Sequence, residues 1–103
     1  MQNRIEVFEQ MHAGDPDNTM VLFGLANEYL KNGEGEKGIK ALESYIEKAD
    51  DEGAAYGMLS KAYEDLGDLE KAKSLLKQGV EAAMSHGHPT MAGEFNERIE
   101  SMG

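Results

Sequence analysis

Apolar residues recur along most of this chain with the spacing of an α-helix. Two segments place them three and four residues apart, so that each segment has one apolar face. These faces consist of Leu22, Leu25, Ala26 and Tyr29 in the first segment and of Tyr56, Leu59, Ser60 and Tyr63 in the second. A short glycine-containing stretch and a second amphipathic segment follow each of them, around Leu42 and around Leu76. The pattern predicts two antiparallel helical hairpins.

The two predicted hairpins are related by a repeat of 34 residues. Paired positions are Leu25 with Leu59, Tyr29 with Tyr63, Gly33 with Gly67, and Leu42 with Leu76. A regular period of this size indicates stacked helical repeats, each of which buries its apolar face against its neighbours. Gly33 and Gly67 are then the turn glycines of equivalent hairpins.

The repeat resembles the tetratricopeptide-repeat family, whose unit reads W-x2-L-G-x2-Y, then A-x3-F, then P. The first copy has Leu22-x2-Leu25-Ala26-x2-Tyr29 and Gly38-x3-Leu42; the second has Tyr56-x2-Leu59-Ser60-x2-Tyr63 and Ala72-x3-Leu76; and Arg4-x3-Phe8 with Pro16 forms half a unit upstream. Neither full copy keeps the tryptophan, the first glycine or the final proline. The resemblance covers residues 1 to about 86 and implies an all-α fold, a superhelix of antiparallel helix hairpins with about six helices.

We expect one domain over residues 1–103. It would comprise an N-terminal half-repeat helix at 3–16, a first repeat at 19–52, a second repeat at 53–86 and a C-terminal capping helix at 89–102. Asp17 or Asn18 is suited to cap the start of the first repeat. The spacing of Met91, Phe95, Ile99 and Met102 predicts the inward face of the capping helix, with Glu94 and Arg98 directed outward.

Composition narrows the function classes. The 103 residues carry a formal charge of -10 that is spread along the chain, which disfavours nucleic acid as a partner. The absence of cysteine excludes disulfides and thiolate chemistry. No apolar run is long enough for a membrane span, and the N-terminus lacks the features of a signal peptide, so a cytoplasmic location is the expectation.

Candidate chemistry is sparse, and we expect no enzyme activity, cofactor or metal site. Gly33, Gly35 and Gly38 match G-x-G-x-x-G, but the preceding segment has helical spacing, whereas a dinucleotide loop follows a strand. His86 and His88 lack a defined third ligand for a metal. The loop from Asp15 to Asn18 lacks the glycine and the final acid of a calcium loop. The serines have no base at a recognisable spacing.

A second stripe on the first helix of each repeat is the candidate partner-binding surface. Beside the core face lie Met20, Phe23, Asn27 and Leu30 in the first repeat and Gly57, Met58, Lys61, Glu64 and Asp65 in the second. The resemblance implies that such residues line a concave groove that binds a peptide or a partner helix. Some members of the family hold the acidic C-terminal tails of chaperones with a set of basic residues, and this sequence lacks the complete set. Glu64 and Asp65 would also repel such a tail. Two alternatives are open: Phe23 and Leu30 are core residues under the N-terminal helix, or the chain self-assembles as a homodimer.

Overall fold

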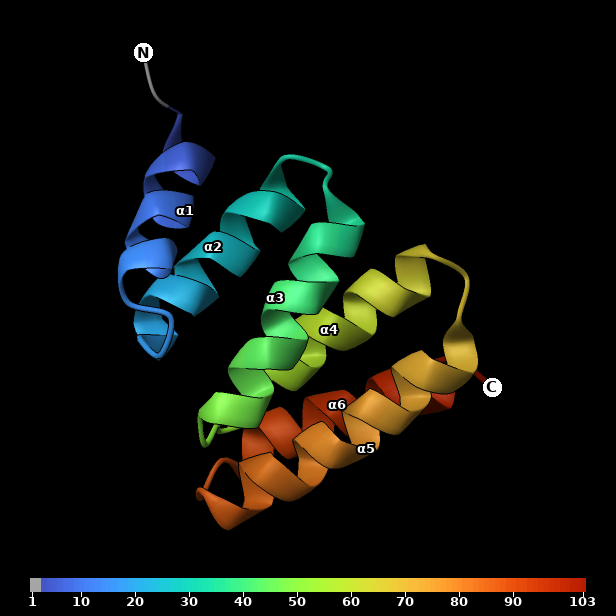
Figure 1. Ribbon diagram of the computed structural model, residues 1–103. Helices are drawn as coiled ribbons and strands as arrows, with labels where there is room; N and C mark the ends of the chain where they lie inside the picture. The colour runs from blue at the N-terminus through green and yellow to red at the C-terminus, as the bar shows by residue number, and fades with distance from the viewer. Residues whose placement is uncertain (1–2) are drawn as a thin grey trace. The chain divides into compact units, whose positions relative to one another are not determined.

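The computed structural model describes residues 3–103, and all of the regular secondary structure in this range is helical (Figure 1). The helices are α1 (Arg4–Gly14), α2 (Thr19–Lys31), α3 (Gly35–Lys48), α4 (Ala54–Asp65), α5 (Leu69–Ser85) and α6 (Pro89–Ser101). The predicted all-α class with six helices is therefore confirmed. The chain divides into two compact units, Met1–Asp50 with α1 to α3 and Asp51–Gly103 with α4 to α6. No helix within residues 3–103 is both long enough and apolar enough to cross a membrane.

In the first unit, glycines allow the helices to approach closely. A Cβ atom at Gly38 of α3 would lie 2.6 Å from Cδ2 of Leu30 on α2. A Cβ atom at Gly24 of α2 would lie 2.6 Å from Cε1 of Phe8 on α1. Real Cβ contacts are longer than this, so α2 packs against α3 on one side and against α1 on another because both sites lack a side chain. Leu42 of α3 is fully buried in the core.

Both hairpins turn at the glycines that the repeat predicted. Gly33 has φ +77° and Gly67 has φ +83°, a left-handed conformation that favours glycine. The residue after each glycine donates its backbone N–H to a tyrosine carbonyl, Glu34 to Tyr29 at 2.9 Å and Asp68 to Tyr63 at 3.0 Å. This bond closes a Schellman motif and satisfies a carbonyl that the helix end would otherwise leave without a partner.

In the second unit, α6 covers the hairpin formed by α4 and α5. The Phe95 side chain is 8% exposed. Its ring approaches α4 at Gly57 and α5 at Gly79, since a Cβ atom at either position would lie 2.8 Å from a ring carbon. Between α4 and α5, the buried Ser60 hydroxyl donates a hydrogen bond to the Ala72 carbonyl at 2.8 Å. One large ring and two glycines thus define how three helices meet.

Side chains from the two acidic loops cap the N-termini of the helices that follow, α2 and α4. Asn18, rather than Asp17, caps α2, because its Oδ1 accepts from the backbone N–H groups of Met20 at 3.1 Å and Val21 at 3.2 Å. Before α4, Oδ2 of Asp51 accepts from the N–H groups of Gly53 and Ala55. The acid therefore acts two residues before the glycine that immediately precedes the helix.

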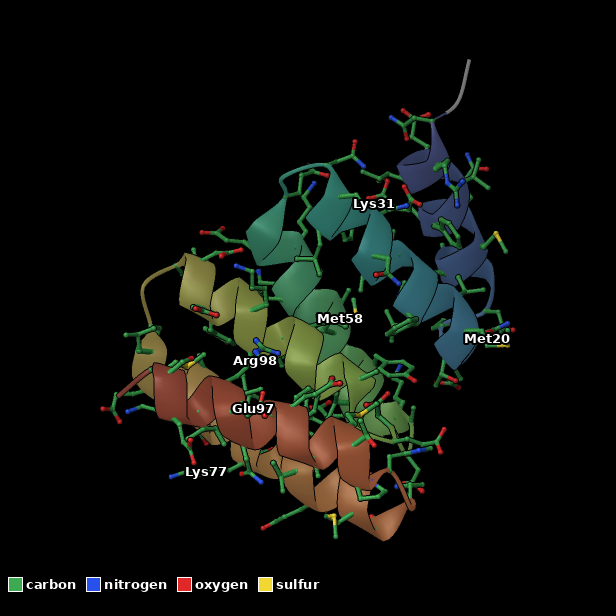
Figure 2. All side chains as sticks on the ribbon, turned by 180° about the vertical axis from the view of Figure 1, so that it is seen from behind. Met20, Lys31, Met58, Lys77, Glu97 and Arg98 are labelled. Carbon is green, nitrogen blue, oxygen red and sulfur yellow. The ribbon has the colours of Figure 1, made fainter. Side chains whose placement is uncertain are left out.

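The predicted outward direction of Arg98 is wrong. Its Nη1 atom donates to the carbonyl oxygen of Gly57 at 3.4 Å, and its guanidinium lies 5.9 Å from the centre of the Phe95 ring. Figure 2 shows Arg98 reaching toward α4 within this unit. Because Gly57 has no side chain, its carbonyl stays accessible to a donor from α6, and the arginine stem covers the ring.

Candidate functional site

The predicted stripe on α2 begins with a large apolar side chain in solvent. Met20 lies in the first turn of the helix and is 84% exposed (Figure 2). The backbone N–H of Met20 donates to Oδ1 of Asn18 in the helix cap, so the backbone is held at this position while the side chain lies in solvent. A methionine side chain is unbranched and flexible, so it can adapt to an apolar surface of irregular shape.

Phe23, one turn further along α2, is half-buried and packs on α3. Its ring centre lies 4.9 Å from that of Tyr45, and the two ring planes are inclined by 45°. Leu30 is also half-buried and lies over Gly38 of α3. Phe23 and Leu30 of α2 are therefore supported by α3. The ring of Phe8 on α1 lies instead on Gly24.

Asn27 lies between Phe23 and Leu30 along the stripe and is half-buried. Within residues 3–103, its amide makes no side-chain hydrogen bond. A half-buried amide flanked by apolar groups offers one acceptor and two donors to a polar group of a partner, for example the backbone of a peptide.

The predicted residues on α4 have different surroundings. Met58 is half-buried. Nζ of Lys61 donates to Oδ1 of Asp65 at 2.9 Å, and this hydrogen bond, followed by the charge of Asp65, raises the pKa of Lys61. Both side chains are exposed, so the ion pair adds little to stability and can exchange partners. The position equivalent to Phe23 is Gly57, which Phe95 and Arg98 cover. The part of the stripe that carries exposed apolar groups is therefore on α2.

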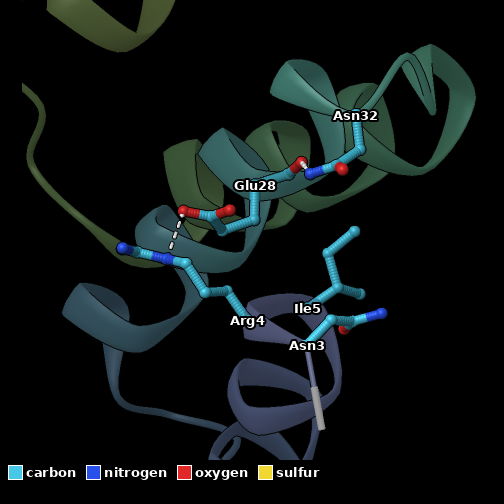
Figure 3. A pocket seen from close by; sticks show the side chains of 5 residues that line it. All are labelled: Asn3, Arg4, Ile5, Glu28 and Asn32. Carbon is cyan, nitrogen blue, oxygen red and sulfur yellow. Dashed lines mark hydrogen bonds and ion pairs between the residues drawn. The ribbon is translucent and has the colours of Figure 1, made fainter. Parts of the chain in front are cut away.

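A polar pocket between α1 and α2 was not predicted from the sequence (Figure 3). The Glu28 carboxylate is almost fully buried, and its Oε1 lies 3.0 Å from Nε of Arg4. Nδ2 of Asn32 donates to the backbone carbonyl of Glu28 at 2.7 Å. Together with Asn3 and Ile5 these residues line a cavity of about 250 Å³. Glu28 lies three residues after Leu25, on the edge of the core face, which is the sequence signal that could have indicated its burial.

A second polar contact joins the same helices. The Tyr29 hydroxyl donates to Oε2 of Glu9 at 2.5 Å. Burial, followed by this hydrogen bond and the charge of Glu9, raises the pKa of Tyr29 to about 12. In each of these two contacts, a polar group of α1 pairs with a polar group of α2: Arg4 with Glu28, and Glu9 with Tyr29. We interpret both pairs as links between α1 and α2.

The glycine motif has a structural explanation in each of its three positions. Gly33 forms the turn, Gly35 is the first residue of α3, and Gly38 faces Leu30 inside the hairpin. A dinucleotide-binding loop follows a β-strand, whereas this glycine motif follows the helix α2.

His86 and His88 each contact a different polar group rather than sharing one. Nε2 of His88 lies 2.8 Å from Oε1 of Glu52, and Nδ1 of His86 lies 2.8 Å from the Ala82 carbonyl oxygen. In the part of the chain that the structure describes, no three or more His, Cys, Asp or Glu side chains are grouped to hold a metal ion.

Comparison with known proteins finds the same repeat. Family profiles described as "Tetratricopeptide repeat" match residues 5–60 and residues 53–85. A "TPR repeat-containing protein" of Pseudomonas aeruginosa is 35% identical over 83 residues, which cover 81% of this chain and 79% of that protein. The crystal structure of MamA superposes with a TM-score of 0.69 at 20% identity, covers 95% of this chain and is matched over 66% of its own length, which shows a shared fold. The chain belongs to the tetratricopeptide-repeat family.

Proposed function

We propose that this chain binds a peptide or a partner helix along the exposed face of α2. The contact residues on α2, in the first unit, would be Met20, Phe23, Asn27 and Leu30. On α4, in the second unit, they would be Met58, Lys61 and Asp65. The single observation that carries the proposal is the apolar stripe on α2, which starts at the 84% exposed Met20 and continues over the half-buried Phe23.

Family membership supports the general part of this function. Tetratricopeptide-repeat proteins are protein-interaction or scaffold modules and generally lack enzymatic activity. The net charge of -10 favours a protein partner over a nucleic acid, because a polyphosphate backbone would be repelled. We therefore propose a binding module without catalysis.

The chemistry of the stripe suits an amphipathic ligand. Recognition of a helix or an extended peptide by a helical surface relies on a few apolar anchors and on polar groups that orient them. Met20 and the Phe23–Tyr45 ring pair provide the apolar contacts, and Asn27 provides an amide beside them. Full burial of a methionine side chain is worth about 1.5–3 kcal/mol, so Met20 alone can account for roughly a tenfold to hundredfold change in affinity.

The ion pair on α4 would act on orientation more than on affinity. Lys61 and Asp65 are both exposed and already neutralise each other. A ligand with one charged group gains only if it replaces one member of the pair, and such exchanges at exposed sites contribute little free energy. We therefore expect Lys61 to affect which ligands bind rather than how tightly the best one binds.

The test begins with selection of ligands from a displayed peptide library on the wild-type chain. Binding of a selected peptide is then measured for Met20→Asp, for Phe23→Ala with Lys61→Ala, and for Met84→Asp as a matched control. Met84 is 58% exposed on α5, so its replacement should leave the affinity unchanged. Equal affinity of the Met20→Asp variant and the wild type would overturn the assignment to α2.

Self-assembly is the alternative function, and the specific observation in its favour is an exposed apolar face on α1. Val7 is 41% and Met11 is 47% exposed on this helix. A homodimer through α1 would leave the α2 stripe open to a ligand, whereas a homodimer through the stripe would compete with one.

A further inference from the structure

The outer face of α1 carries four residues with the three-and-four spacing of a helix-pairing surface: Arg4, Val7, Met11 and Gly14. The Arg4 side chain is 75% exposed, Val7 is 41% exposed and Met11 is 47% exposed. A Cβ atom at Gly14 would have no neighbour within 4 Å. All four positions are therefore exposed, although Nε of Arg4 is also paired with the Glu28 carboxylate of α2.

The same stripe one repeat later is covered by a helix. Adding 34 residues to Arg4 and Met11 gives Gly38 and Tyr45 of α3. Gly38 lies under Leu30, and the Tyr45 ring packs on that of Phe23, so both contact the preceding helix, α2.

The second unit repeats this arrangement. The positions equivalent to Arg4 and Met11 are Ala72 and Gly79 of α5. The Ala72 carbonyl accepts a hydrogen bond from Ser60 of α4. A Cβ atom at Gly79 would lie 3.0 Å from Cβ of Tyr56 on α4 and 2.8 Å from the Phe95 ring on α6, so both positions contact α4 and Gly79 also contacts α6. In each complete hairpin this face is a helix-docking surface, and the same face is exposed on α1.

We propose that the face of α1 docks against α1 of a second copy of this chain, in an antiparallel pair related by a two-fold axis. In this register Val7 lies opposite Met11 of the second copy, and Arg4 lies opposite Gly14 of the second copy. The same patch is used twice, as a closed dimer requires. The inference does not rest on peptide binding by α2, because it uses a different helix.

Size and charge along the stripe favour this occupant. Arg4 is its largest residue and Gly14 its smallest, so the antiparallel register places the long side chain over the open position. Nε of Arg4 is engaged by Glu28, while the outer end of the guanidinium is directed away from that carboxylate (Figure 3). Asp15, which is exposed and follows Gly14, would meet this outer end in the second copy.

A cavity on the same face can receive the partner side chain. It has a volume of about 270 Å³ and is lined by Asn3, Arg4, Val7 and Phe8. In the antiparallel register Met11 of the second copy is the side chain nearest to it. Methionine is unbranched and flexible and fills irregular apolar spaces.

The pair should be weak and reversible. An eleven-residue helix contributes a contact smaller than those of stable dimers, which bury about 1,200–2,000 Å². Each copy also carries a formal charge of -10, which opposes association until salt screens it. At about 0.15 M salt we expect a dissociation constant on the order of 0.1–1 mM.

Sedimentation velocity over a dilution series up to about 1 mM tests the pair. The wild type should shift toward the mass of a dimer, and both Met11→Glu and Gly14→Arg should raise the dissociation constant at least about tenfold. Gly14 has a negative φ and open space around it, so its replacement should leave the helical circular dichroism unchanged. The control Met84→Glu should associate like the wild type. A wild type that stays monomeric, or a Met11→Glu variant that matches the control, would overturn the proposal and assign the face to a helix of another protein.

Cross-linking tests the register, because the chain has no cysteine of its own. A mixture of the single variants Val7→Cys and Met11→Cys, oxidised at high concentration, should give mainly the mixed disulfide dimer. A disulfide requires Cα atoms within about 7 Å, so the product reports which residues face each other. Predominance of the two homodimeric products would indicate a parallel pair and contradict the antiparallel arrangement.

Discussion

Replacing Phe95 should reverse the effect of the substitution Gly57→Ala on stability, from destabilising to stabilising. In the wild type, a Cβ atom at Gly57 would lie 2.8 Å from Cζ of the Phe95 ring, and the ring cannot retreat because it also meets Gly79. Gly57→Ala alone should therefore destabilise, since overpacking costs about 1–3 kcal/mol and the gain in helix propensity returns only about 1 kcal/mol. Phe95→Ala alone should cost about 3–5 kcal/mol, a large part of the stability of a small domain.

In the Phe95→Ala background the obstacle to a Cβ atom at Gly57 is gone. Gly57→Ala should then stabilise by about 0.5–1 kcal/mol through helix propensity. Urea denaturation at low temperature, followed by circular dichroism, gives the four free energies of unfolding for this double-mutant cycle. Gly93→Ala on α6 is the control, because nothing lies within 4 Å of its Cβ position and it should stabilise both backgrounds equally. Equal effects of Gly57→Ala in the two backgrounds would refute the packing of α6 on α4 described above.

Three further outcomes are expected. The pKa of Tyr29 is raised from its usual value of 10.0 to about 12 in the folded state, so folding favours the neutral hydroxyl. This contribution to stability is complete below pH 10 and is lost as the pH rises toward 12. Denaturation across this pH range should show a loss that is smaller in Tyr29→Phe, and an unchanged loss would contradict the role of the bond to Glu9. Asn18→Ala should cost about 1 kcal/mol in the free energy of unfolding, because two N–H groups at the start of α2 lose their acceptor; a neutral effect in urea denaturation would argue against the cap. Gly67→Ala should cost about 1–2 kcal/mol because of its φ of +83°, whereas a stabilised protein in thermal denaturation would show that the turn relaxes.

The periodic part of the sequence predicted most of the fold. Spacing around Leu25 and Leu59 gave the first helix of each hairpin, and the period gave Gly33 and Gly67 as turns, which their positive φ angles confirm. These features depend on local rules of helix geometry and on the side chain that each residue carries. They can therefore be deduced without knowing which elements meet.

Contacts between helices were less predictable. The spacing of Arg98 placed it on the polar side of its helix, but a glycine on α4 exposes a carbonyl that its guanidinium reaches. Lys61 was expected as a residue that orients a ligand, and it is bound to Asp65 one turn away. Periodicity along one helix gives the face of a residue but not the neighbour opposite that face, and this neighbour decides whether a charged group is directed to solvent.

The candidate surface on α2 shows the same division. Sequence spacing grouped Met20, Phe23, Asn27 and Leu30 on one stripe, but it could not tell which of them the rest of the chain supports. Phe23 and Leu30 rest on α3, while Met20 remains exposed. The degree of exposure along a stripe depends on the size of the opposing residues, and here Gly38 and Tyr45 lie on α3.

Mapping of amide chemical shifts by NMR tests most directly the claim that α2 carries the binding surface. A peptide selected on the wild-type chain is titrated into the labelled protein, and the shift changes are followed residue by residue. We expect the largest changes at Met20, Phe23 and Asn27, and none at the outer face of α5 around Met84. Changes concentrated on α1 or α5, with α2 unaffected at saturation, would contradict this claim.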